Sequence, residues 1–227
     1  MLKFYYNAAP NPMKVALFLE EAYLQYEPVP LDTRKGDQHT AEYLAINPNA
    51  KAPAIVDDGV AIFDSNAILL YLAEKSGKFL PSDAAKRGPL LSWLMFVATG
   101  VGPYSGQSVH FKHFAPKGLD YAVNRYDFEA HRHYQILDQQ LADNRYMLGD
   151  EYTIVDMAVW GWARLIPRVL DEQAMNSFPA LKRLVDEVSA RPAAERAIAL
   201  ASSHQFKTDM DADAHRAMFP QNERLKK

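Results

Sequence analysis

The chain has 227 residues, of which 48% are hydrophobic and 23% are charged, and its formal net charge is −3. This composition excludes a largely disordered chain. The sequence contains no cysteine, which excludes protein disulfides, thiolate metal ligands and every mechanism with a protein thiol as nucleophile.

Charge and hydropathy argue against nucleic-acid and membrane partners. The sequence has no basic field, no lysine run, and no stretch near the ~18–20 apolar residues of a membrane span. Residues 1–6 lack the basic start and long apolar run of a secretory signal. We therefore expect a cytoplasmic protein.

The first 80 residues alternate short strand and helix patterns. Residues 2–6 are aromatic and β-prone, and apolar spacing after a proline-containing turn predicts a helix over residues 13–23. Residues 27–31 are typical of an edge strand, because proline cannot donate to a central ladder. The turn signal Asp57-Asp58-Gly59 predicts a hairpin between strands over 52–56 and 60–63. A helix is predicted over 66–76, with a cap at Asp64 or Ser65 before it and Gly77 after it.

The pattern becomes helical after Pro81 and shows no convincing strand from residue 85 to about residue 203. Helices are predicted over 90–98, 121–142, 154–169 with an interruption at Pro167, 179–190 and 192–201. The predicted fold class is a small α/β domain over residues 1–80, joined through residues 79–87 to an all-α domain over residues 87–203.

Two local features extend these predictions. Gly100, Gly102 and Gly106, interleaved with Pro103, predict a helix break that opens room within the helical domain. The C-terminal tail, residues 204–227, is polar except for an apolar island over residues 217–220. We expect Met218 and Phe219 to dock on the protein body while residues 224–227 stay mobile; the alternative is a disordered tail.

Four strings carry a resemblance to a known family. They are Asn47-Pro48-Asn49-Ala50-Lys51-Ala52-Pro53, Asp64-Ser65-Asn66-Ala67-Ile68-Leu69-Leu70-Tyr71-Leu72, Thr153-Ile154-Val155-Asp156, and the stretch from Gly102-Pro103 to His113-Phe114-Ala115-Pro116. With the order of elements, they make nearly the whole chain resemble the cytosolic glutathione transferases, most closely the bacterial nu class. The resemblance implies a thioredoxin-like N-terminal domain that binds glutathione, a helical second domain, a homodimer and a role in detoxification.

The resemblance assigns roles in glutathione binding to two of these strings. A cis peptide between Ala52 and Pro53 would turn the backbone of Ala52 toward the peptide-like ligand. At the start of the next helix, Ser65 would take the α-carboxylate and Asp64 would pair with the α-ammonium. The alternative for Asp64-Ser65 is a plain helix cap. The Thr153–Asp156 string is a capping box, to which we assign a structural role only.

Asn11 is the predicted activator of the glutathione thiol. Residues 7–13 contain no tyrosine, serine or cysteine, and the nu-class resemblance places an active-site asparagine here. Its N–H would donate to the sulfur; helix capping is the alternative, and catalysis by Tyr5 or Tyr6 is less favoured. Ala9 replaces a threonine of some close relatives, so a second hydroxyl donor is missing.

Further ligands follow from the resemblance. Gln38 and Lys51 are expected near the glycyl end, and Arg132 reaches the glutathione site, across a dimer. The second substrate is expected against an apolar wall formed by Pro103, Tyr104, Gln107 and Phe111. His110 and His113 are expected to shape this cleft, and no metal is expected from them or from His131 and His133.

The predicted function is a glutathione-dependent enzyme with glutathione as co-substrate and no metal. Two chemistries stay open: thiolate attack on a small disulfide, which the nu-class resemblance favours, and thiolate attack on a carbon electrophile. The alternative is a non-catalytic glutathione-binding or regulatory module, because a fold does not fix an activity.

Overall fold

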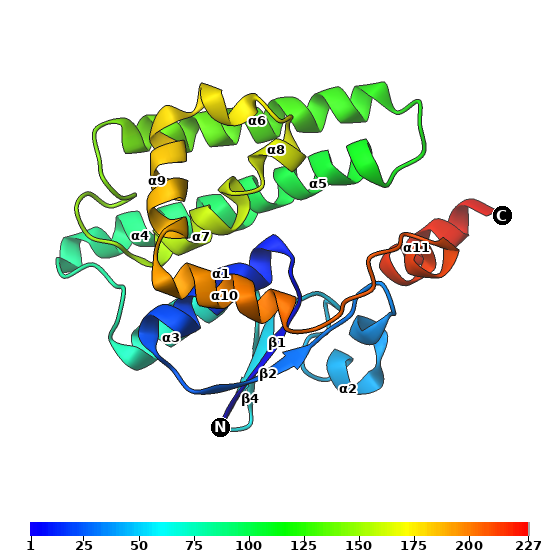
Figure 1. Cartoon of the computed structure of the whole chain (residues 1–227), viewed down its shortest axis with the longest axis horizontal. Coiled ribbons are helices and arrows are strands. Elements are labelled where there is room, and N and C mark those ends of the chain that lie inside the picture. Colours follow the sequence, from blue (N-terminus) through cyan, green and yellow to red (C-terminus); the bar gives the residue numbers. More distant parts are fainter. Residues whose placement is uncertain (227) are drawn as a thin grey trace. The chain divides into compact units, whose positions relative to one another are not determined.

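The computed structural model describes residues 1–226 (Figure 1). The chain divides into two compact units. One contains residues 1–68 together with the chain from residue 195 onward, and the other contains residues 69–194. The first unit is therefore built from both ends of the chain. The expectation of mobility at Lys227 lies outside the described residues.

A four-stranded mixed sheet forms the centre of the first unit, in the order β2-β1-β3-β4. Its strands are β1 (Leu2–Tyr6), β2 (Tyr26–Pro30), β3 (Ala54–Asp57) and β4 (Val60–Phe63). β1 is parallel to β2 and antiparallel to β3, and β3 pairs with β4 through the predicted hairpin. β2 lies at an edge of the sheet, as its prolines require. The order of strands and helices predicted for the first 80 residues is also confirmed.

The first unit also contains the helices α1 (Pro10–Ala22), α2 (Ala41–Leu44) and α11 (Ala212–Met218), with 3-10 turns at Asp37–His39 and Pro220–Lys226. The division between the units falls within α3 (Ser65–Ser76), which begins in the first unit, and within α10 (Pro192–Ser202), most of which belongs to it. α1 begins three residues earlier than predicted, because Pro10 and Pro12 suit the first helical turn. α3 ends before Gly77, whose φ of 67° is the expected left-handed end.

The C-terminal segment packs along the first unit (Figure 1). The Arg196 guanidinium donates to Glu20 Oε2 at 2.6 Å and to the Glu20 carbonyl at 3.0 Å. The Tyr6 hydroxyl donates to the Leu200 carbonyl at 3.3 Å, and the Tyr6 ring contacts Phe206 edge-on. α10 and the chain after it therefore belong structurally with β1 and α1.

The second unit is helical, as predicted. It contains α4 (Arg87–Phe96), a π-helical segment (Val97–Val101), α5 (Gly102–His113), α6 (Asp120–Ala142), α7 (Ile154–Ala163), α8 (Ile166–Val169) and α9 (Pro179–Ser189). Extended pairing in its described part is limited to a single bridge between Tyr146 and Gly149. Across residues 1–226, no helix combines the length and apolar character that crossing a bilayer requires.

The predicted helix break at the glycines is wrong. α4, the π-helical segment and α5 run on with right-handed helical dihedrals, and the Gly102 N–H donates to the Val97 carbonyl across the widened turn. A Cβ on Gly100 would lie 2.5 Å from His133 Nε2, and one on Gly102 would lie 3.2 Å from Trp162 Nε1. These glycines admit aromatic side chains against the helix, and the π turn accommodates Pro103.

The Thr153–Asp156 capping box is confirmed. Asp156 Oδ2 accepts the Thr153 N–H at 2.8 Å, and Asp156 Oδ1 accepts the Met147 N–H at 2.8 Å. Full burial raises the pKa of Asp156 to about 6. The box starts α7, whose Met157, Ala158 and Trp160 are fully buried, as predicted.

Candidate functional site

Asn11 is the second residue of α1 and is half-buried. Ala9, and not Asn11, occupies the N-cap position, and the Ala9 N–H is taken by Asn7 Oδ1 at 3.0 Å. Pro10 and Pro12 have no N–H, so Asn11 alone among the first three helical residues carries a backbone donor. The donors at this helix start are thereby concentrated on Asn11.

The peptide between Ala52 and Pro53 is cis, as predicted. The loop before it is held by the Lys51 carbonyl, which accepts from the Tyr43 hydroxyl at 2.7 Å and from Asn47 Nδ2 at 2.5 Å. Burial raises the pKa of Tyr43 to about 12, so its hydroxyl stays protonated as the donor. Ala52 packs against the small core of Leu31, Tyr43 and Ala54, and the Lys51 side chain is exposed.

Asp64 has a positive φ of 72° and caps α3. Its Oδ1 accepts the N–H of Asn66 at 2.9 Å and the N–H of Ala67 at 3.1 Å. The capping interpretation is therefore confirmed for Asp64, whose side chain stays exposed. Ser65 beside it is buried. Lys14 Nζ lies 3.4 Å from Ser65 Oγ and 3.3 Å from Asn66 Oδ1.

Lys14 is the residue of this region that the sequence interpretation missed. It lies inside a run of buried residues from 12 to 19 and is itself only 1% exposed. The signal was present, because Lys14 is the one charged residue in an otherwise apolar run. Burial lowers the pKa of Lys14 to about 7, and the Asp64 carboxylate opposes that shift.

Gln38 is 4% exposed and is engaged by the C-terminal tail. Its Nε2 donates to the Thr33 carbonyl at 3.1 Å and to the Ala217 carbonyl at 3.0 Å. His39 Nε2 also lies 2.9 Å from the Ala217 carbonyl. Gln38 Oε1 is buried and has no hydrogen-bond partner in the described part of the protein.

The tail docks on the segment before Gln38 through backbone groups of residues 207, 208 and 217, whereas docking by Met218 and Phe219 themselves stays a prediction. Arg34 Nη1 donates to the carbonyls of Lys207 at 2.9 Å and Thr208 at 2.6 Å, and Asp32 Oδ2 accepts the Lys207 N–H at 2.7 Å. Met218 and Phe219 are half-buried, while the fully buried residue of α11 is Ala214.

In the second unit, Arg132 lies on α6 with 46% of its side chain exposed. It donates to Glu129 Oε2 at 2.9–3.0 Å, and Arg125 lies 3.1 Å from Glu129 Oε1. The Arg132 hydrogen bond is the main cause that holds the pKa of Glu129 below its usual range. Arg132 is thus a half-exposed cation tethered to its own helix.

Three of the predicted wall residues, Tyr104, Gln107 and Phe111, form one stripe along α5, because they are spaced by three, four and seven positions. Pro103 lies four positions before Gln107. Pro103 and Gln107 are exposed, and Tyr104 and Phe111 are half-buried. The Tyr126 ring of α6 stacks on Phe111 at 5.2 Å between centroids and contacts Tyr104 at 6.3 Å. The stripe is therefore backed by a second aromatic residue that the sequence interpretation missed.

The predicted histidines have structural contacts. His133 Nδ1 lies 2.6 Å from the Glu129 carbonyl, and its ring stacks on Phe96. His113 Nε2 lies 3.0 Å from the Arg168 carbonyl, and His131 contacts Phe178. Within residues 1–226 there is no group of three histidine or acidic side chains arranged to hold a metal ion.

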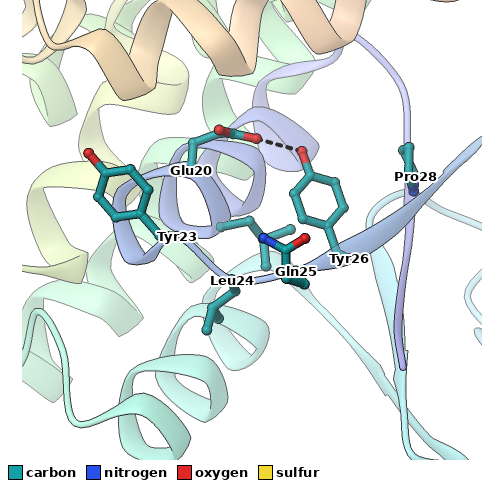
Figure 2. Close-up of a pocket in the computed structure, with 7 residues that line it drawn as sticks. Glu20, Tyr23, Leu24, Gln25, Tyr26 and Pro28 are labelled. Carbon is teal, nitrogen blue, oxygen red and sulfur yellow. Dashed lines mark hydrogen bonds between the residues drawn. The ribbon is translucent and has the colours of Figure 1, made fainter.

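A pocket of about 350 Å³ lies at the far end of α1 (Figure 2). Glu20 accepts the Tyr26 hydroxyl there at 2.8 Å. At ~1.5 Å rise per residue, the 13-residue helix separates this pocket from Asn11 by roughly 15 Å. None of the predicted site residues lines it; its lining is Leu19, Glu20, Tyr23, Leu24, Gln25, Tyr26 and Pro28.

Comparison with known proteins finds a matching family model in each of the two units. The family model for the glutathione S-transferase N-terminal domain matches residues 2–74, and the model for the C-terminal domain matches residues 120–192. The chain is 40% identical over 216 residues to the disulfide-bond oxidoreductase YfcG of Escherichia coli (strain K12), covering 92% of this chain and 100% of that protein.

Solved structures agree with the sequence comparison. A glutathione transferase family member from Pseudomonas fluorescens Pf-5, with two glutathione bound, has a TM-score of 0.83 at 37% identity, covering 87% of this chain and 92% of that chain. A glutathione transferase from Pseudomonas putida, with one glutathione disulfide bound per subunit, has a TM-score of 0.82 at 34% identity, covering 87% and 90%. The match extends over most of the chain in sequence and in fold.

Proposed function

Because the chain belongs to the glutathione S-transferase family, we propose that it binds glutathione in its first unit and uses the glutathione thiolate to reduce small disulfides. The main support is the relative from Pseudomonas putida, which holds glutathione disulfide, the oxidised product of such a reaction. A relative of 40% identity is also a disulfide-bond oxidoreductase by name. We place the protein with the nu class and in the cytoplasm, with a role in detoxification.

The reaction transfers two electrons from two glutathione molecules. The first thiolate attacks one sulfur of the substrate disulfide; the S–S bond breaks, and the leaving thiolate takes a proton. The second thiolate attacks the glutathione sulfur of the mixed disulfide, releasing the second substrate thiol and glutathione disulfide. Both attacking sulfurs belong to ligands, which suits a chain without cysteine.

Asn11 supports the attacking thiolate. The start of α1 carries the positive end of the helix dipole, and the paired prolines leave Asn11 as the donor-bearing residue of its first three positions. A donor to the ionised sulfur lowers the thiol pKa from its ordinary ~8.5 and increases the thiolate fraction near neutral pH. Ala9 adds no hydroxyl, so the side chain and N–H of Asn11 carry this role.

The remaining groups position the tripeptide. The Ser65 hydroxyl and the start of α3 take the γ-glutamyl α-carboxylate, and the Asp64 carboxylate takes the α-ammonium. The backbone of Ala52 pairs with the cysteinyl residue, and Lys51 faces the glycyl carboxylate. Gln38 joins the glycyl end when the tail releases its amide. Pro103, Tyr104, Gln107 and Phe111 receive the second substrate.

We propose a homodimer in which Arg132 serves the partner's glutathione site. Phe128 lies four residues before Arg132, on the same face of α6, and is 60% exposed. A large apolar side chain beside the cation is typical of an interface. Light scattering should give a dimer for the natural chain and a monomer for Phe128→Asp. The matched variant Tyr121→Asp alters a residue that is 84% exposed on the same helix, and it should remain dimeric.

A paired assay tests the chemistry. Glutathione is supplied with 2-hydroxyethyl disulfide in one arm and with 1-chloro-2,4-dinitrobenzene in the other. We expect turnover of the disulfide to exceed conjugation of the aromatic. Conjugation without disulfide reduction would overturn the proposed reaction. Glutathione binding by calorimetry without turnover in either arm would identify a binding module instead.

A further inference from the structure

Lys14 is a buried lysine to which the proposed chemistry assigns no role. It sits on α1, one turn after Asn11, in a stretch where every side chain from 12 to 19 is buried. A buried lysine is costly unless its ammonium is hydrogen-bonded, because burial removes it from water. Its position beneath the start of α3 therefore invites a functional explanation.

The contacts of Lys14 lead directly to the proposed carboxylate subsite. Its Nζ lies 3.4 Å from Ser65 Oγ and 3.3 Å from Asn66 Oδ1, and all three residues are buried. An ammonium donates and cannot accept, so Ser65 Oγ must be the acceptor in this contact. The hydroxyl hydrogen of Ser65 then points away from Lys14 and remains available as a donor.

We propose that Lys14 is a positioning residue for carboxylate recognition: its ammonium holds the Ser65 hydroxyl as a donor toward the γ-glutamyl α-carboxylate and supplies the balancing positive charge from below. This inference rests on the proposed function, because it names the group that prepares the glutathione subsite. Lys14 contacts the Ser65 hydroxyl directly, so its effect is carried through that group.

Protonation of Lys14 makes this recognition dependent on pH. Burial lowers the Lys14 pKa to about 7, and the charged group that faces it is Asp64, from the turn before α3. The acidic residues of α1 itself, Glu20 and Glu21, lie at the opposite end of that helix. A neutral amine can accept the Ser65 hydrogen and turn the hydroxyl inward. A bound carboxylate favours the ammonium, so binding above neutral pH takes up a proton.

The experiment compares two ligands without a free thiol, so that sulfur ionisation does not interfere. They are S-methylglutathione and its analogue lacking the γ-glutamyl α-carboxylate. Calorimetry of the natural chain in two buffers of different ionisation enthalpy should show proton uptake at pH 8 for S-methylglutathione only. Its affinity should fall roughly three- to tenfold from pH 6.5 to 8.5, within the tenfold per pH unit that one titrating group permits.

Lys14→Met should weaken S-methylglutathione binding about tenfold, abolish proton uptake and leave binding of the decarboxylated analogue unchanged. Lys14→Gln, which can still donate to Ser65 Oγ, should recover part of the affinity without the pH dependence. Lys3→Met removes a lysine that is half-exposed on β1 and should match the natural chain in both ligands.

Three outcomes decide the matter. Undiminished binding of S-methylglutathione by Lys14→Met overturns the inference and leaves the proposed function intact. An equal loss of affinity for both ligands in Lys14→Met also overturns the inference, since a loosened fold weakens the binding of both. Thermal unfolding of Lys14→Met and of Lys14→Gln shows whether the fold has been loosened. Failure of the natural chain to bind S-methylglutathione overturns the proposed function itself.

Discussion

At the scale of single residues, the two prolines around Asn11 concentrate the donors at the start of α1 on one side chain and one N–H. Asn11→Ala is therefore expected to lower turnover more than glutathione affinity. A donor to developing charge is worth ~2.7–4 kcal/mol in favourable sites, and a diffuse thiolate places the loss at the lower end, roughly a hundredfold in kcat. Steady-state kinetics with calorimetry on the same variant measure both quantities, and an unchanged kcat would falsify the assignment.

Asp64 caps α3 and also carries the negative charge proposed to pair with the α-ammonium of glutathione. Two substitutions separate these two roles. Asp64→Asn keeps an oxygen for the N–H groups of Asn66 and Ala67, so stability should change little while glutathione binding weakens. Asp64→Ala should lose the same affinity and also ~0.5–2 kcal/mol of unfolding free energy. Denaturant unfolding beside calorimetry checks the pair. Natural affinity in Asp64→Asn would remove the carboxylate from the ligand site.

Lys14 also leaves a signature in stability. Its pKa is lowered on folding from 10.5 to about 7, so the unfolded chain binds more protons between these values. The contribution of Lys14 to folding stability therefore rises with pH through this window. Lys14→Met should flatten that rise and, near pH 7, stabilise the protein by about 1–4 kcal/mol. Unfolding free energies at pH 7 and pH 9 test it; a variant destabilised at both would show that the ammonium holds the fold together.

At the scale of elements, the tail is tied to the protein by backbone groups more than by its apolar island. Truncation after Gln205 removes the hydrogen bonds that Arg34 and Gln38 donate to the tail and the one that Asp32 accepts from it. It should therefore lower the free energy of unfolding by ~1–3 kcal/mol. It also frees the Gln38 amide, so glutathione affinity should rise. Hydrogen exchange in the natural chain should be slow over 212–217. Fast exchange there, or an unaltered stability after truncation, would contradict docking.

The elements themselves were largely predictable from local signals. The prolines of β2 predicted its edge position, and Asp57-Asp58-Gly59 predicted the hairpin. Thr153 with Asp156 predicted the start of α7. The glycines of the π-helical segment and α5 were misjudged because glycine marks close approach as well as a break. Only the partner, His133 from a distant helix, distinguishes these cases.

The site was less predictable, because its contacts join distant parts of the chain. Gln38 was expected near the glycyl end of the ligand, and its engagement by Ala217 depends on a contact 179 residues away that the local sequence does not indicate. Lys14 was overlooked because a lone lysine in an apolar helix suggests a solvated edge, whereas α3 covers it here. The roles given to Asn11, Lys51 and Arg132 stay predictions.

At the scale of the whole molecule, two arginines test the division into units. Arg196→Ala removes the bonds to Glu20 in the first unit. Arg183→Ala is the matched change in the second unit, since Arg183 donates to the carbonyls of Leu141, Asn144 and Arg145. Hydrogen exchange should rise in α1 and α10 for the first variant, and at the end of α6 for the second. Increases spread over both units in either variant would contradict the division.

The two-ended first unit has a consequence for how the protein is made. Synthesis proceeds from the N-terminal side at ~5–20 residues per second, so residues 69–194 are synthesised before α10 is complete. During that time β1 and α1 lack the contacts that Tyr6 and Glu20 make with α10. The second unit is therefore completely synthesised before the first unit, although the first unit begins earlier in the chain. The synthesis of α10, and not the appearance of residue 80, is therefore the event that lets the glutathione-binding unit close.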